Sequence, residues 1–131
     1  VYASLGVQEY ALVTEDYLTD PTYGRRPYHV DPVAAPLPTY LGPLGLPGMT
    51  AYFGLLRVGQ LQPGETVVIS GAAGGVGSTA GQIARLKGCR VIGITSSDEK
   101  CATVVDRFGF DACLNYKSGT LRDELAALAP D

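Results

Sequence analysis

Three glycines at a spacing of three residues form the pattern in this chain that is best suited to chemistry. Gly71, Gly74 and Gly77 follow directly after the apolar segment Val67–Ser70. In a dinucleotide-binding turn, the first glycine permits a tight turn, the second lets the backbone approach a pyrophosphate, and the third lets the next helix pack against the strand. The free N–H groups and positive dipole at that helix N-terminus supply an anion site. The pattern predicts dinucleotide binding, in preference to a purely structural turn.

The residues after the next apolar segment bear on which dinucleotide is bound. An NAD site has a carboxylate there that accepts a hydrogen bond from the ribose 2′-hydroxyl. Here Ser96 and Ser97 follow the segment, and the first acid, Asp98, already opens a predicted helix. Hydroxyl groups together with Lys100 suit a 2′-phosphate, so we predict NADP. A structural alternative, compatible with this one, is a capping box of Ser96 with Glu99 and a solvated Lys100.

A tyrosine and a threonine complete the candidate residues. Tyr116 follows the third predicted strand, where the adenosine half of a dinucleotide would lie, and Lys117 adds positive charge beside it. Tyr116 could flank the adenine or reach the 2′-phosphate, although a tyrosine at a strand end is more commonly a packing residue. Thr50 precedes an apolar pattern at helical spacing and is predicted to be the N-cap of a helix.

Two other glycine-rich motifs share part of this pattern and are excluded. Segment 71–77 also satisfies the G-x-x-x-G-x-G of short-chain dehydrogenases, but none of the eight tyrosines has a lysine four residues later, as their catalytic Y-x-x-x-K requires. A P-loop has a lysine directly after its last glycine, whereas Ser78 and Thr79 follow Gly77 here.

Alternating strands and helices are predicted from about residue 50 onward. The expected strands are Glu65–Ser70, Arg90–Ile94 and Asp111–Asn115. Expected helices begin at Thr50, follow the glycine turn up to Gly88, and cover about Asp98–Phe108. A last helix, lined by Leu121, Leu125 and Leu128, is closed by Pro130. Short connections between them predict a parallel α/β sheet in the order 3-2-1, a partial Rossmann fold. The helix after the glycine turn is expected to place Val76, Ala80, Ile83 and Ala84 against the sheet.

The strand that comes first in the sequence, Glu65–Ser70, has no neighbour on its outer side in this order. A complete dinucleotide fold places a fourth strand there. Without it, the apolar segment Val67–Ile69 is a bare sheet edge, which is prone to pair with other chains. We therefore expect either that this chain is a piece of a longer protein or that another chain covers the edge.

The composition excludes several classes of function. With 46% hydrophobic and 18% charged residues, the 131-residue chain is expected to be globular, and its net charge of −3 argues against a nucleic-acid partner. No apolar run approaches the ~20 residues that a membrane span needs. Cys89, Cys101 and Cys113 fit no zinc pattern and are predicted to be buried free thiols in a reducing cytoplasm. His29 is the only histidine, so no metal site is predicted.

Three separated segments resemble the zinc-independent medium-chain dehydrogenase/reductases, in the branch of leukotriene/prostaglandin and alkenal reductases. They read LGPLGLPGMTAYFGLL, GETVVISGAAGGVGSTAGQIARLKGCRVIGITSSDEK and GFDACLNYK, and the resemblance covers roughly residues 36–117. Val1–Val13, in which Val7–Val13 is a candidate strand, resembles the end of that family's GroES-like catalytic domain. The resemblance thus implies a remnant of this domain and a connection over residues 1–45, and the first half of an NADP-binding Rossmann domain over residues 46–131.

The resemblance also implies a reaction, in which NADPH reduces the C=C bond of an α,β-unsaturated ketone or aldehyde. Hydride goes to the β-carbon, and the resulting enolate is protonated. The residues implied to bind the cofactor are Gly74, Gly75, Val76 and Gly77 at the pyrophosphate, Lys100 and Tyr116 at the 2′-phosphate, and Thr50 near the nicotinamide. By the resemblance, the family's tyrosine at the enolate oxygen would lie in the parts of that family that this chain lacks, so no catalytic residue is named.

Two other functions remain open at this point. One is a non-catalytic module that senses a dinucleotide, and the other is an enoyl-reductase domain of a larger synthase. For the reductase, we expect a full-length cytoplasmic homodimer that acts on a small molecule and has no nucleic-acid or membrane partner.

Overall fold

The computed structural model describes residues 10–16 and 29–130. The chain divides into two units, Val1–Tyr40 and Leu41–Asp131. In the first unit, residues 10–13 have no regular structure, so the strand expected at Val7–Val13 does not form there, and residues 7–9 lie outside the described part. Most of the segment that resembles a GroES-like domain is likewise outside it. A 3-10 helix, η2 (Leu37–Leu41), ends this part of the chain.

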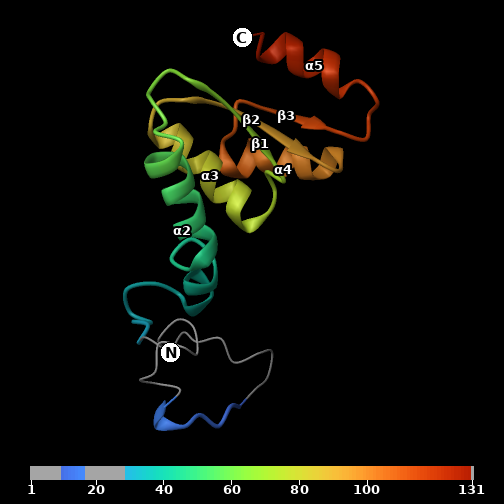
Figure 1. The fold of residues 1–131 in the computed structure, drawn as a ribbon. Coiled ribbons are helices and arrows are strands. Elements are labelled where there is room, and N and C mark those ends of the chain that lie inside the picture. Colours follow the sequence, from blue (N-terminus) through green and yellow to red (C-terminus); the bar gives the residue numbers. More distant parts are fainter. Residues whose placement is uncertain (1–9, 17–28, 131) are drawn as a thin grey trace. The chain divides into compact units, whose positions relative to one another are not determined.

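A three-stranded parallel sheet forms the centre of the second unit (Figure 1). Its strands are β1 (Thr66–Ser70), β2 (Arg90–Thr95) and β3 (Ala112–Asn115), in the order β1-β2-β3. Val68 pairs with Ile92, and Ile92 pairs with Ala112. The structure confirms the predicted α/β fold and strand order. Within residues 10–16 and 29–130, no strand pairs with the outer edge of β1.

Helices follow each strand and cover the sheet. They are α2 (Leu46–Tyr52), which continues into a π-helix, η3 (Phe53–Val58), then α3 (Gly75–Leu86), α4 (Asp98–Phe108) and α5 (Leu121–Leu128). Figure 1 shows α3 and α4 on one face of the sheet and α5 on the other side. Both α3 and α4 contact β2, and α2 packs against α3. The bounds of α4 agree with the sequence prediction, and α5 contains the three leucines that were predicted to line it.

The face of α3 that packs on the sheet consists of small residues. Gly77, Ala80, Gly81 and Ala84 are buried, whereas Val76, predicted to face the sheet, is 42% exposed. A Cβ atom on Gly81 would lie 1.9 Å from the ring of Phe110. Because the helix lies this close to its neighbours, the glycines occupy the buried face and the bulkier Val76 is turned outward.

Thr50 does not start a helix, contrary to the prediction. It lies inside α2, whose N-cap is Gly45, and its Oγ1 donates to the carbonyl of Leu46 at 2.8 Å. The helix begins earlier because Pro47 stands in its first turn, where the missing N–H has no helical partner to lose.

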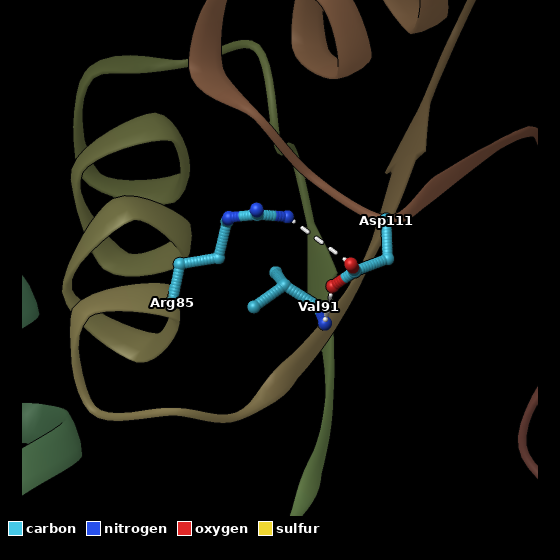
Figure 2. A network of polar contacts seen from close by, with 3 residues as sticks. All are labelled: Arg85, Val91 and Asp111. Carbon is cyan, nitrogen blue, oxygen red and sulfur yellow. Dashed lines mark hydrogen bonds and ion pairs between the residues drawn. The ribbon is translucent and has the colours of Figure 1, made fainter.

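Asp111 links the amino ends of β2 and β3 through hydrogen bonds and an ion pair (Figure 2). Its Oδ2 accepts from the backbone N–H of Val91 at 2.7 Å, and its own N–H donates to the Val91 carbonyl at 2.9 Å. Its Oδ1 lies 3.1 Å from the guanidinium of Arg85, near the end of α3. These contacts hold the edge of the sheet opposite the candidate site.

The three cysteines are free thiols. Cys89 is buried, as predicted, but Cys101 and Cys113 are only partly buried. None of the described helices is long and apolar enough to cross a membrane.

Candidate functional site

A pocket of about 400 Å³ opens at the carboxyl edge of the sheet. This is where parallel α/β sheets bind their ligands. The strand ends, the glycine turn and the start of α4 all contribute to its lining: Ser70, Gly71, Ala73, Gly74, Ile94, Thr95, Ser96, Lys100 and Tyr116. Lys100 is the one charged residue among them, so the lining has a positive charge and no carboxylate.

The glycine turn has the geometry that its spacing predicts. Gly71 adopts a left-handed φ of 60°, and its carbonyl accepts from the N–H of Gly74 at 2.8 Å. A Cβ atom on Gly77 would lie 2.4 Å from the Gly71 carbonyl oxygen, which leaves no room for a side chain. The turn is therefore closed by backbone contacts that only glycine allows at position 77.

No side chain of the helix caps the N–H groups at the N-terminus of α3. Gly74 is the N-cap and makes no side-chain hydrogen bond to the first turn. The first N–H groups of a helix have no partner within it. Those of Gly75, Val76 and Gly77 are thus available to an anion, and the helix dipole favours negative charge there.

Ser97, not Ser96, caps α4. The Ser97 Oγ accepts from the backbone N–H of Lys100 at 3.3 Å, so the predicted capping box of Ser96 with Glu99 is wrong. The reason is that α4 begins at Asp98, which makes Ser97 its N-cap. Ser96 is consequently free to line the pocket, where its Oγ accepts from the ammonium of Lys100 at 3.4 Å.

Tyr116 is anchored by its backbone next to the end of β2. Its N–H donates to the carbonyl of Thr95 at 3.0 Å, and its side chain is 52% exposed. The ammonium of Lys117 lies 6.0 Å from the centre of the Tyr116 ring, but Lys117 does not line the pocket. Tyr116 is thus an exposed aromatic at the pocket rim and not a packing residue.

Behind the pocket, Thr95 contacts two thiols. Its hydroxyl lies 3.0 Å from the Sγ of Cys101 and 3.8 Å from that of Cys113. Burial, and next the hydrogen bond with the Cys101 thiol, raise the pKa of Cys113 from 9.0 to about 12. Cys113 is therefore a protonated thiol near pH 7. Among the described residues, no group of three histidine, cysteine or acidic side chains could hold a metal ion.

The structure brings together part of the predicted site. Gly74, Ser96, Lys100 and Tyr116 line the pocket, whereas Thr50, Gly75, Val76, Gly77 and Ser97 do not. Sequence reasoning did not name the lining residues Ser70, Ala73, Ile94 and Thr95 as site residues. Three of these stand at or next to the last residue of a strand, and this position is the signal that could have identified them.

Comparisons with known proteins agree with this geometry. Residues 75–131 match the family described as "Zinc-binding dehydrogenase". The chain is 49% identical to the NADPH-dependent curcumin reductase of Escherichia coli over 69% of this chain and 26% of the reductase. It is 50% identical to prostaglandin reductase 1 of Rattus norvegicus over 76% of this chain and 30% of that enzyme. The chain spans between 26% and 36% of the length of the curated relatives reported for it.

A solved structure gives the same result in three dimensions. CurA of Vibrio vulnificus in complex with NADPH superimposes with a TM-score of 0.68 and 49% identity, over 72% of this chain and 28% of CurA. The predicted resemblance is therefore confirmed. The chain's relatives are reductases of the zinc-independent branch of the medium-chain dehydrogenase/reductases, and the chain shares a partial Rossmann fold with them.

Proposed function

We propose that this chain is the cofactor-binding half of an NADPH-dependent oxidoreductase. The observations that carry the proposal are the free backbone N–H groups at the start of α3, which follow the lining residue Gly74, and the pair of Lys100 and Ser96 in the pocket lining. A dinucleotide needs an anion site for its pyrophosphate, and a 2′-phosphate needs a cation and hydroxyl donors. The residues present fit NADPH, which supplies a hydride when bound.

The proposed roles follow these two features, the start of α3 and the Lys100–Ser96 pair. The backbone of Gly74, Gly75, Val76 and Gly77 would bind the pyrophosphate, while Ser96, Lys100 and Tyr116 would surround the 2′-phosphate. Ser97 would contribute indirectly, because its hydroxyl accepts from the backbone N–H of Lys100 and so fixes the position of that residue. Thr50 near the nicotinamide stays a proposal from the family resemblance, since it lines neither this pocket nor the groove between α2 and α3.

The proposed reaction is reduction of the C=C bond of an α,β-unsaturated ketone or aldehyde. It is supported by the likeness to a curcumin reductase and a prostaglandin reductase. In this proposal residues 46–131 are the first half of the NADP-binding domain, and residues 1–45 are the end of a GroES-like catalytic domain with its connection. The full-length protein would be a cytoplasmic homodimer.

Turnover by the full-length protein tests this function. We expect oxidation of NADPH with 2-alkenals and enones, with the saturated ketone or aldehyde as product, and none with the matching saturated compounds as substrates. Tight NADPH binding without oxidation by any enone would reject the reductase and favour a non-catalytic dinucleotide module.

A further inference from the structure

Asp98 is the first acid after the end of β2, and it is the first residue of α4. It lies between Ser96 and Lys100, both of which line the pocket, and it is exposed in the first turn of the helix. Asp98 itself is not part of the lining. A carboxylate at the end of a second strand accepts from the ribose 2′-hydroxyl and so favours NAD. The position of this side chain therefore bears on cofactor choice.

Asn115 binds the carboxylate of Asp98. The Asn115 Nδ2 donates to Oδ1 of Asp98 at 2.9 Å, although the two residues are 17 positions apart. The other end of the amide is fixed as well, because Oδ1 of Asn115 accepts from the backbone N–H of Lys117 at 3.0 Å. With its oxygen committed to an N–H donor, the amide can present only its NH₂ group to Asp98.

The Asn115 side chain thus joins the two elements that form this side of the pocket. Asn115 is the last residue of β3 and pairs with Thr95 at the end of β2. It directly precedes Tyr116, and its partner Asp98 begins the helix that carries Lys100. The amide of Asn115 thus binds Asp98, the acid of the first α4 turn that directly follows the two serines at the end of β2.

We infer that Asn115 is a positioning residue for cofactor choice, which holds the Asp98 carboxylate away from the 2′-phosphate end of the pocket. The inference rests on the proposed NADPH function. Without the amide, the carboxylate is free to turn toward the pocket, where it repels a 2′-phosphate and offers an acceptor to a 2′-hydroxyl.

The test is a binding cycle with full-length variants, in which NADPH and NADH are titrated separately. Asn115→Ala is expected to weaken NADPH binding roughly tenfold, the size of one charge-assisted contact, with NADH binding unchanged or stronger. Asp98→Asn keeps an oxygen acceptor for Asn115 but removes the charge, so it should leave NADPH binding intact. In the double variant, removal of the charge should restore NADPH binding to within about twofold of the unaltered protein.

Three results would overturn the inference. They are an unchanged ratio of NADPH to NADH affinity in Asn115→Ala, an equal loss for both cofactors, and a double variant that Asp98→Asn does not rescue. If Asn115→Ala does not fold, Asn115→Ser keeps an oxygen acceptor for the Lys117 N–H, adds no charge and is too short to donate to Asp98, and the same selective loss is expected. An unaltered protein without NADPH preference would instead refute the proposed function, so the two failures are distinguishable.

Discussion

The ammonium of Lys100 lies 3.4 Å from the hydroxyl of Ser96, and both groups line the pocket at the carboxyl edge of the sheet. The pair exists because Ser97 takes the cap of α4 and leaves Ser96 free. We propose that this cation and hydroxyl, held side by side, are the feature by which the site distinguishes a 2′-phosphate from a 2′-hydroxyl.

Replacement of Lys100 by alanine should therefore act on one cofactor. Lys100→Ala is expected to weaken NADPH binding by about an order of magnitude, since a charge-assisted contact contributes ~1.5–3 kcal/mol, and to leave NADH binding nearly unchanged. Fluorescence titration of both cofactors measures this. Lys117→Ala is the matched control, because Lys117 lies outside the lining and its loss should matter much less. An equal loss for NADPH and NADH in Lys100→Ala would mean that the lysine supports the fold.

Gly75→Val should block both cofactors alike while the protein stays folded. A Cβ atom at this position meets only the side chain of Pro47, at 3.5 Å, which is an ordinary contact. The added side chain would instead crowd the N-terminus of α3, where the pyrophosphate is proposed to bind. Titration of NADPH and NADH, with thermal unfolding as the check on folding, tests this. Unchanged binding would place the nucleotide elsewhere.

Gly77→Ala should damage the fold itself. Its Cβ would lie 2.4 Å from the Gly71 carbonyl oxygen, a backbone atom that cannot turn aside. Overpacking of this kind costs ~1–3 kcal/mol. Urea unfolding compared with Gly75→Ala, which fits without a clash, isolates the effect. Equal stability of the two variants would contradict the close approach of α3 to the turn.

Asp111→Ala should destabilise the protein more than Arg85→Ala. Loss of the carboxylate leaves the N–H of Val91, a fully buried residue, without its acceptor, which costs ~1–3 kcal/mol. The ion pair is solvated, with side chains 47% and 37% exposed, and such pairs contribute at most ~1 kcal/mol. Urea unfolding of both variants decides the order, and a larger loss in Arg85→Ala would show that the ion pair dominates.

The Cys113 thiol should make stability fall at alkaline pH. Its pKa is raised from 9.0 to about 12 in the folded state, so the unfolded chain releases this proton first as the pH rises. The contribution of the neutral thiol is fully present below pH 9 and is lost as the pH rises toward about 12. In Cys113→Ser the fall in stability with pH should be shallower, and identical profiles by urea unfolding would refute the role of burial at this thiol.

The regular part of the fold follows from the sequence because local signals and packing agree there. Gly109 ends α4 with a left-handed φ of 72°, and the bounds of that helix agree with the prediction. Periodicity failed at Val76, since the buried stripe of α3 was chosen by hydrophobicity whereas close packing selected glycine and alanine. The start of α2 was predicted too late, at Thr50, because Pro47 lies in the first turn of the helix, where its missing N–H costs no hydrogen bond.

Site residues could be predicted where the residue type and spacing indicate one chemical role. They could not be predicted where the role depends on where a helix begins or on which strand ends lie side by side. Lys100 and the glycine turn were identified by charge and spacing. That Ser97 and not Ser96 is the N-cap of α4 could not be predicted, because the N-cap depends on the residue at which α4 begins. The contact of Asn115 with Asp98 joins residues 17 positions apart, and only the paired ends of β2 and β3 bring them together.

The most direct test of the proposed function is the affinity of the unaltered full-length protein for NADPH and NADH, measured by fluorescence titration under identical conditions. The pocket lining predicts that NADPH binds at least about tenfold more tightly, because Lys100 and Ser96 meet the 2′-phosphate and no carboxylate lines the pocket. NADH bound as tightly as NADPH, or neither cofactor bound, would contradict the account.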